Sequence, residues 1–311
     1  MLEVKNLSKF YIKKKIWGKD QEVRALDGVS FNVKKGECLG IVGESGCGKS
    51  TLAKTLLGIE KETSGVATIE GKSRQQLGDK EWHKKIQMVF QDPYSSLNPR
   101  LKAIELIAAP LMINEGLSLK DAKGSALKML QKVGLRAEMA ERYPHMLSGG
   151  QRQRIGLARA LMLRPSILIC DEPVSALDVS IQAQVLNLLM DLQDEFELTL
   201  LFISHDLHVI KHIGHSILVM YLGKVAEFGE RDTLINLPLH PYTQALLGTI
   251  PGLDGKKHPP LQGELPSPLN PPPGCTFHKR CPKAQKSCEI NIPPPTIKSG
   301  RIVACDLITS Q

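Results

Sequence analysis

The sequence predicts an α/β protein, and three observations lead to this fold class. Apolar runs typical of strands alternate with helix-like runs over roughly the first 250 residues. A glycine-rich turn joins one of these strands to the helix that follows it. A second strand-like run ends in two acidic residues. Strands that alternate with helices predict a mostly parallel sheet.

The expected elements follow in chain order. A strand at 38–42 runs into the glycine-rich turn, and a helix at 50–57 ends at Gly58. Residues 101–147 contain no convincing strand, so we expect a helical insertion with helices at 103–112 and 119–133. Further helices are expected at 151–163 and 179–192, and further strands at 167–170, 198–203 and 216–222. Gly223-Lys224 suits a two-residue hairpin turn, because glycine tolerates the positive φ that the first position needs.

Composition sets the outer limits of the interpretation. The 311 residues suit one large or two modest domains, and an apolar content of 42% excludes a wholly disordered chain. No apolar run reaches the ~18 residues of a membrane-spanning helix. The first five residues lack the apolar core of a signal peptide, so we expect neither export by that route nor a membrane span.

The net charge of +8 lies at the two ends of the chain. Residues 1–20 carry +4, residues 255–311 carry +5, and the middle carries −1. Basic ends are compatible with nucleic acid, a membrane surface, an acidic partner or simply solvated charge. Composition alone does not choose between these readings.

Proline marks a boundary near residue 254. Eleven of the 20 prolines lie at or beyond Pro259, and three of their runs cannot sit inside helices or central strands. The sequence therefore predicts a body at 1–254 and a short irregular tail at 255–311. The tail is too poor in apolar residues to fold without a stabilising cross-link such as a bound metal.

The glycine-rich turn fits the phosphate-binding pattern G-x-x-x-x-G-K-S/T. Its residues are Gly43, Glu44, Ser45, Gly46, Cys47, Gly48, Lys49 and Ser50, followed by Thr51. Backbone N–H groups in such a loop converge on an anion, and the following helix adds its positive N-terminal end. Lys49 would reach the β- and γ-phosphates of a nucleotide, and Ser50 would ligate Mg²⁺.

A nucleotide site also needs an acidic group for the metal and another for the attacking water. Asp171 and Glu172 follow the apolar strand at 167–170. Two acids after a strand more often begin a helix, but a phosphate-binding loop in the same chain reverses that preference. We expect Asp171 to hold the Mg²⁺ and Glu172 to orient the water.

The run Leu147-Ser148-Gly149-Gly150-Gln151 ahead of a helix would expose N–H groups and a hydroxyl to a phosphate. With the two motifs above, it makes the sequence resemble the ATP-binding subunits of ABC transporters over essentially residues 1–250. The resemblance implies a P-loop NTPase fold of the ABC-type nucleotide-binding domain, with a helical subdomain at about 92–147.

The family's weaker motifs occur in the family's order. Tyr11 matches the aromatic that stacks on adenine, Gln91 the Q-loop that links Mg²⁺ and water to the membrane subunits, and His205 the switch histidine at the γ-phosphate. Residues 175–178, which end in Asp178, match the D-loop. Taken singly, Tyr11 is as compatible with a surface aromatic and His205 with a helix start.

The resemblance implies a mechanism. Two such domains meet head to tail, so that each phosphate loop faces Ser148 to Gln151 of the other domain. ATP joins the pair and hydrolysis separates it, which drives a transporter through its cycle. A groove between Gln91 and the helical subdomain would receive a short helix from a permease subunit.

The tail narrows the resemblance to the ATPases of oligopeptide and dipeptide permeases. Residues 263–268, 274–282 and 240–243 are similar to that subfamily, as is the run 90–100 in the body. Together with Gly43-Glu44-Ser45, the run 90–100 favours the second of the two sibling ATPases of such systems.

Four of the seven cysteines lie in the tail: Cys275, Cys281, Cys288 and Cys305. Their spacing, C-x5-C-x6-C-x16-C, lacks the close pair typical of zinc sites, and four such thiolates can hold a 4Fe–4S cube. Zinc and unmetallated thiols stay open, with His278 as a fallback ligand. The subfamily resemblance also implies a 4Fe–4S cluster, which would staple the tail.

The expected function is that of an ATP-hydrolysing subunit that powers import of di- and oligopeptides. The expected partners are two transmembrane permease subunits, a sibling ATPase and, indirectly, an extracytoplasmic substrate-binding protein. We expect a peripheral location at the cytoplasmic face of the inner membrane and no nucleic-acid partner. The alternatives are import of nickel or another solute, an ABC-type ATPase acting on nucleic acid, and a cluster-based redox sensor.

Overall fold

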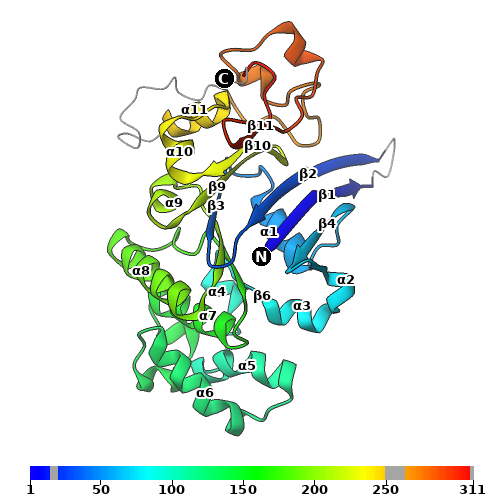
Figure 1. The fold of residues 1–311 in the computed structure, drawn as a ribbon. Helices are drawn as coiled ribbons and strands as arrows, with labels where there is room; N and C mark the ends of the chain where they lie inside the picture. Colours follow the sequence, from blue (N-terminus) through cyan, green and yellow to red (C-terminus); the bar gives the residue numbers. More distant parts are fainter. Residues whose placement is uncertain (15–19, 249–262, 309–311) are drawn as a thin grey trace. The chain divides into compact units, whose positions relative to one another are not determined.

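The computed structural model describes residues 1–14, 20–248 and 263–308, drawn in Figure 1. The chain divides into two compact units, which are described separately. Unit 1 comprises residues 1–33, 37–71 and 202–311, and unit 2 comprises residues 34–36 and 72–201. The boundary expected near residue 254 lies outside the described residues.

An antiparallel sheet in unit 1 was not predicted. β1 (Leu2–Lys13) pairs with β2 (Gln21–Val33) on one side and with β4 (Ser64–Ile69) on the other. Both pairings contain register shifts, which break the strict alternation that marks a strand in a sequence. The expectation of a mostly parallel sheet is therefore correct for only part of the fold.

The second set of strands in unit 1 contains the predicted strands. β3 (Cys38–Val42) lies parallel to β9 (Ser216–Tyr221), and every residue of both strands is buried. Strands covered on both faces read as continuous apolar runs, which is why the sequence revealed them. β10 (Lys224–Glu230) lies antiparallel to β9.

The hairpin between β9 and β10 corrects one prediction. Tyr221 pairs with Lys224, so the two turn residues are Leu222 and Gly223 rather than Gly223 and Lys224. Their φ angles are 44° and 77°, the two positive values that a tight hairpin turn requires. An added Cβ at Gly223 would meet the carbonyl oxygens of Arg24 and Ala25 at 2.9 Å, which explains the glycine at the second position.

The tail is less irregular than its proline content indicates. β12 (Arg301–Val303) pairs with β10, and β11 (Thr296–Lys298) pairs with β12, so the tail extends the sheet. Two 3-10 turns, η3 (His278–Arg280) and η4 (Lys286–Glu289), precede these strands. Figure 1 shows this part of the chain, coloured orange to red, beside β10.

A buried ion pair fastens the tail to β10. The guanidinium of Arg301 donates to the carboxylate of Glu227 at 3.1 Å, and the two side chains are 4% and 0% exposed. The same nitrogen donates to the carbonyl oxygens of Thr233 and Leu237, and so covers the end of a short helix. Breaking such a pair from one side is strongly destabilising, because it leaves an uncompensated buried charge.

The helices of unit 1 are short. They are α1 (Lys49–Leu57), α9 (Leu207–Ile213), α10 (Arg231–Asn236) and α11 (Pro241–Gly248). α1 confirms the helix predicted at 50–57. It ends at Gly58, whose φ of 77° allows the left-handed cap that stops the helix.

Unit 2 is mainly helical. The parallel strands β6 (Ile86–Val89) and β7 (Ile167–Asp171) accompany α2 (Arg74–Leu77), α3 (Asp79–Lys85), α4 (Pro93–Ser96), α7 (Gly149–Leu161) and α8 (Val179–Phe196). The remaining short elements are β5 (Lys72–Ser73), η1 (Ala137–Glu141) and η2 (Pro144–Met146). The division between the units falls within β8 (Thr199–Ile203).

Two further helices confirm the predicted helices between residues 101 and 147. α5 (Ala103–Glu115) and α6 (Leu119–Lys132) match the expected ranges within a few residues. The Ser118 hydroxyl accepts the Asp121 N–H and caps α6, whose buried positions Ala122, Ala126, Met129 and Leu130 recur at helical spacing.

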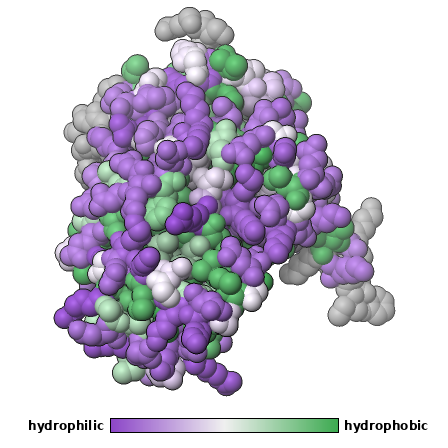
Figure 2. Space-filling model, turned by 60° about the horizontal axis from the view of Figure 1, so that its bottom comes forward, coloured by the Kyte–Doolittle hydropathy of each residue, from purple (hydrophilic) through white to green (hydrophobic). Residues whose placement is uncertain are grey.

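The surface in Figure 2 is mainly hydrophilic, with hydrophobic side chains in separate small groups. Exposed apolar side chains of unit 2 include Tyr94, Ile113 and Met146, which are 61%, 81% and 53% exposed. Among the described residues, no helix combines the length and apolar character needed to cross a membrane.

Candidate functional site

The glycine-rich turn between β3 and α1 has the geometry of an anion-binding loop. Its last glycine, Gly48, is the N-cap of α1 and has no side chain to bond the first N–H groups of the helix. The Leu52 N–H bonds back to the Gly48 carbonyl at 2.9 Å, so the helix is regular from its start. The N–H groups at this end are the natural partners of a phosphate.

Two glycines of the loop are required by close packing. An added Cβ at Gly43 would lie 2.3 Å from the Met220 carbonyl oxygen, and one at Gly48 would lie 2.4 Å from that of Ala25. Their φ angles of 151° and 109° are also rarely adopted by other residues. The loop is therefore pressed against neighbouring backbone, which fixes its shape.

The Lys49 ammonium is buried and bonds to the loop itself. Its Nζ donates to the carbonyl oxygens of Gly43 at 2.7 Å and Glu44 at 3.0 Å. The Sγ of Cys47 lies 4.0 Å from the same nitrogen. The ammonium is thus already held inside the loop, and a bound polyphosphate would exchange neutral carbonyl partners for charged ones.

Tyr11 lies on β1, within reach of α1. Burial, followed by the nearby Glu60 charge, raises the pKa of the Tyr11 phenol, and the Thr51 hydroxyl is one of its hydrogen-bond partners. The Lys9 ammonium sits 4.8 Å from the centre of the ring. Unit 1 therefore places the predicted adenine-stacking residue next to the helix that follows the phosphate loop.

His205, the predicted switch histidine, is exposed directly after β8. The adjacent Ser204 N–H donates to the carbonyl oxygen of Ile41 at 3.2 Å. Ile41 belongs to β3, whose end leads into the phosphate loop. The segment that carries His205 is therefore fastened to the strand that carries the loop.

In unit 2 the two predicted acids sit where β7 ends. The Asp171 side chain is only 5% exposed, and Glu172 follows with a φ of 44°. A glutamate in the left-handed region is strained, and such strain is found preferentially at functional positions. The Gln91 amide donates to the Glu172 carboxylate at 3.1 Å, so the predicted Q-loop residue and the predicted catalytic acid are in contact.

The run from Ser148 to Gln151 begins α7. The Ser148 hydroxyl accepts the Gln151 N–H, and the Gln151 side chain accepts the Ser148 N–H, which makes a reciprocal capping box. Ser148 is exposed and its hydroxyl proton is not used by the box. The run is therefore rigid and faces outward.

The D-loop residues lie against this run. An added Cβ at Gly149 would meet Leu177 at 3.4 Å, and one at Gly150 would meet Ile181 at 2.6 Å. Asp178 is exposed and begins α8 without a side-chain capping bond. Unit 2 thus packs Gly149 against the D-loop residue Leu177, and Gly150 against Ile181 of α8.

Sequence reasoning assigned no role to three residues around the phosphate loop. The Tyr242 hydroxyl accepts the Glu44 N–H at 3.0 Å. The Arg280 guanidinium makes two bonds to the Glu44 carboxylate and one, at 3.4 Å, to the Tyr221 hydroxyl. Tyr242 and Arg280 belong to the runs that resemble the peptide-permease subfamily, so only that resemblance could have pointed to them.

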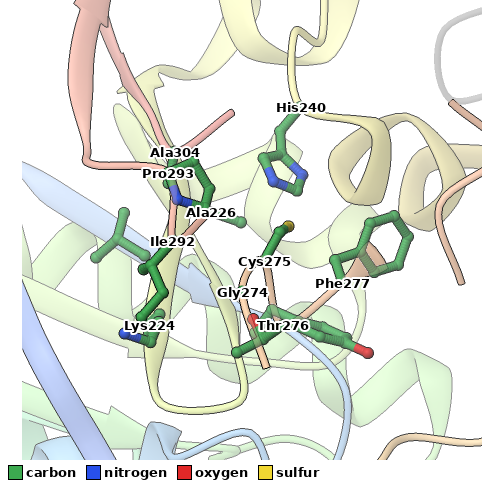
Figure 3. Close-up of a pocket in the computed structure, with 12 residues that line it drawn as sticks. Lys224, Ala226, His240, Gly274, Cys275, Thr276, Phe277, Ile292, Pro293 and Ala304 are labelled. Atoms are coloured by element: carbon green, nitrogen blue, oxygen red, sulfur yellow. The ribbon is translucent and has the colours of Figure 1, made fainter. Parts of the chain in front are cut away.

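The four tail cysteines form no disulfide, and they are close enough to influence one another's charge. Burial first, and then the charges of Cys288, Cys305 and Cys281, raise the pKa of the Cys275 thiol. Figure 3 shows Cys275 and Phe277 beside His240 and Ala226, around a cavity of about 30 Å³. In the described part of the chain, no group of three or more His, Cys, Asp or Glu side chains is arranged to hold a metal ion.

A phosphate loop on a strand-to-helix turn, an acid pair at a strand end and a capped serine run define an ATPase of the ATP-binding-cassette class. The chain belongs to the ABC transporter family: that family's model matches residues 26–175, and the oligopeptide/dipeptide transporter C-terminal region matches residues 226–288. The second match covers α11 and most of the cysteine-bearing tail, and it places the chain among the ATP-binding subunits of that group.

Relatives match almost the whole chain. It is 51% identical to the dipeptide transport ATP-binding protein DppF of Escherichia coli, over 98% of this chain and 93% of that protein. It is 49% identical to the oligopeptide transport ATP-binding protein AppF of Bacillus subtilis, over 99% and 97%. A dimeric ATP-binding cassette, MJ0796, solved in a post-hydrolysis state with ADP and Pi, superposes with a TM-score of 0.65 at 33% identity, covering 74% of this chain and 99% of that one.

Proposed function

We propose that this chain is the ATP-hydrolysing subunit that powers import of di- and oligopeptides through an ABC permease complex. One observation supports peptides as the substrate class. The similarity to peptide-transport subunits continues beyond the ATP site, through the tail, to nearly the end of the chain. A cassette shared with transporters of other solutes would resemble those relatives in its body alone.

The roles of the site residues follow from their chemistry. Lys49 and the N–H groups of Gly43 to Thr51 bind the phosphates, and Tyr11 stacks on the adenine. Glu172 accepts a proton from the attacking water, and Gln91 holds that carboxylate in place through the 3.1 Å hydrogen bond. His205 contacts the γ-phosphate.

Magnesium fits the oxygen donors that the sequence assigned to it. Ser50, Gln91 and Asp171 offer hydroxyl, amide and carboxylate oxygens, which are the ligands that Mg²⁺ prefers. Asp171 is buried at the end of β7, directly before Glu172. When bound, Mg²⁺ would neutralise charge on the phosphates during transfer.

The outward-facing motifs of unit 2 support an assembly of two cassettes. Ser148, Gly149 and Asp178 are exposed, Gly150 and Gln151 are half-buried, and all five belong to unit 2, whereas the phosphate loop belongs to unit 1. We assign them to the phosphate loop of a sibling ATPase, which then forms a head-to-tail heterodimer. Tyr94 and Ile113, apolar side chains left exposed in unit 2, suit contact with a helix of a permease subunit. Two permease subunits and an extracytoplasmic substrate-binding protein complete the complex, at the cytoplasmic face of the inner membrane.

We propose the 4Fe–4S cluster from the chemistry and spacing of the four tail cysteines, because the described residues hold no assembled metal site. Burial raises the pKa of the Cys275, Cys281 and Cys305 thiols, and a backbone N–H donated by the residue two positions later opposes that rise in each case. The Cys275 N–H donates to the Cys288 carbonyl oxygen at 2.8 Å and joins their segments. Four cysteine thiols, three of them with backbone N–H donors, offer the ligand chemistry of an iron–sulfur cluster.

Peptide uptake by cells tests the proposed function. A strain that lacks only this gene should lose uptake of a labelled dipeptide, and the intact gene should restore it. A Glu172→Gln gene should not restore it, whereas Asp191→Asn, which removes an exposed acid from the surface of α8, should. Loss of nickel uptake with unchanged peptide uptake would contradict the peptide assignment.

A further inference from the structure

The phosphate loop carries a carboxylate that is neutralised from the tail. Glu44 is the second residue of the loop, and the Arg280 guanidinium holds it with two parallel bonds, of 2.8 and 3.1 Å. The side chains of Arg280 and Glu44 are only 5% and 25% exposed. A guanidinium that binds both oxygens of a half-buried carboxylate fixes its orientation as well as its charge.

Glu44 is held by all of its polar groups. Its N–H donates to the Tyr242 hydroxyl at 3.0 Å, and its carbonyl oxygen accepts from the Lys49 ammonium at 3.0 Å. Its carboxylate accepts two hydrogen bonds from the Arg280 guanidinium. One residue therefore links the phosphate-binding lysine to the tail. A shift of the Glu44 carboxylate would therefore also move the Glu44 carbonyl oxygen that accepts from the Lys49 ammonium.

Arg280 is itself positioned by an aromatic cluster made of Tyr221, His240, Tyr242 and Phe277. The ring centres of Phe277 and the two tyrosines lie 4.7 to 5.3 Å apart, and Arg280 lies 5.9 Å from the Tyr221 ring centre. His240 is 4% exposed, and its Nδ1 accepts the Tyr242 N–H. Phe277 and Arg280 belong to the tail, so the cluster couples the position of the tail to that of the phosphate loop.

A carboxylate on a loop that binds polyphosphate is unfavourable unless its charge is neutralised. The phosphates of ATP carry several negative charges, and like charges at close range repel strongly where water is partly excluded. Arg280 both neutralises Glu44 and turns its oxygens toward the tail. The tail therefore has a direct electrostatic connection to the anion site.

We propose that Arg280 is a positioning residue of the ATP site, and that the tail sets nucleotide affinity by holding Glu44. This role concerns nucleotide binding only, so its failure would leave the assignment to peptide import untouched. It also gives the tail a role besides any cluster, because Arg280 and Phe277 act through their contacts with Glu44, Tyr221 and Tyr242.

Equilibrium binding of ATP and ADP to the purified full chain tests this role. Arg280→Gln should weaken ATP binding about tenfold, the scale of one lost charge-assisted hydrogen-bonded pair. Affinity for ADP should fall less than affinity for ATP, because the repulsion from the unpaired Glu44 carboxylate grows with the charge of the phosphates. Lys279→Gln is the matched control: it removes an exposed positive charge one residue away and should leave both affinities unchanged.

A double variant separates positioning from simple unfolding. In a Glu44→Gln background the same Arg280→Gln change should alter ATP affinity less than about twofold, because the charge to be neutralised is gone. Arg280→Lys should recover part of the lost ATP affinity, since lysine supplies the positive charge without the two parallel hydrogen bonds. An equal loss in both backgrounds, or an equal loss for ATP and ADP, would overturn the proposal, as would unchanged affinity in the single variant.

Discussion

The Gln91 amide nitrogen donates to the Glu172 carboxylate at 3.1 Å, which joins two residues 81 positions apart in the chain. Glu172 is also held at a φ of 44°. A strained backbone and a side-chain hydrogen bond together leave this carboxylate little freedom. A fixed carboxylate is what the orientation of an attacking water requires.

Glu172→Gln should reduce ATP hydrolysis at least about 100-fold, because an amide cannot take the proton of the attacking water. ATP binding should survive, since Glu172 lies outside the phosphate loop. Phosphate release measures the first effect, and gel filtration of the variant with its sibling ATPase and ATP should show a trapped dimer. Full turnover in the variant would remove Glu172 from its role, and Asp191→Asn serves as the surface control.

Lys49→Ala should weaken ATP binding about 10- to 100-fold, because the ammonium supplies charge-assisted bonds to the phosphates. Lys54→Ala provides the comparison, since Lys54 is an exposed lysine near the other end of the same helix. Titration with a fluorescent ATP analogue measures both. Equal affinities for the two variants would mean that Lys49 only ties the loop together.

Arg301→Met should destabilise unit 1 by about 3–5 kcal/mol, because it leaves the Glu227 carboxylate buried without its partner. The double variant Glu227→Gln with Arg301→Met should recover most of that loss. Urea unfolding followed by circular dichroism measures the difference. If the single and double variants unfold at the same urea concentration, the ion pair is not what fastens the tail.

The destabilisation by Arg301→Met should grow as the pH rises. Burial raises the pKa of Glu227 above its ordinary value of 4.5, against the lowering effects of the His240 and Leu239 amides and of Arg301. A raised pKa means that the folded protein holds this proton more tightly. Its stabilising effect is therefore present below about pH 4.5 and lost as the pH rises through the folded-state pKa.

Removal of Arg301 takes away one of the lowering effects, which raises the folded-state pKa of Glu227 further, so that the loss of stability extends to higher pH and becomes larger. The difference in unfolding midpoint between the variant and the wild type should widen from about pH 4.5 toward neutrality. The double variant, which has no carboxylate at 227, should show no such widening. A constant difference at every pH would contradict this account of Glu227.

Protein purified without oxygen should be brown and contain iron and acid-labile sulfide in roughly a 4:4 ratio. Cys281→Ser should lose the iron and the colour, because the cluster loses one of four ligands. His278→Ala should keep both, since the His278 ring is already bonded to the Cys275 carbonyl oxygen at 2.8 Å. Stoichiometric zinc without iron would contradict the cluster proposal.

The sequence predicted most of the elements that carry the phosphate loop and the acid pair. Strands β3 and β7 are buried on both faces, so their continuous apolar runs stood out. Spacing alone defined the motif from Gly43 to Ser50, because glycine, lysine and serine have distinct tasks there. What was predictable is local: each feature depends on fewer than about ten consecutive residues.

The missed features depend on contacts between distant segments. β1 and β2 contain register shifts that blur alternation, and the left-handed φ of Leu222 has no signal in the residue type. Arg280 and Glu44 are 236 positions apart, and neither belongs to a periodic pattern that would pair them. Long-range ion pairs are set by how the chain packs, and a single sequence does not state that packing.

The strand that carries Arg301 is the last one of its sheet to leave the ribosome. When β10 has been synthesised, Glu227 still lacks its partner, and some 70 further residues must emerge before β12 can pair with it. A chain whose translation stops early therefore exposes a strand edge and a charge that it cannot bury. Such a product would be open to proteases, so completion of the chain is linked to completion of the sheet that supports the ATP site.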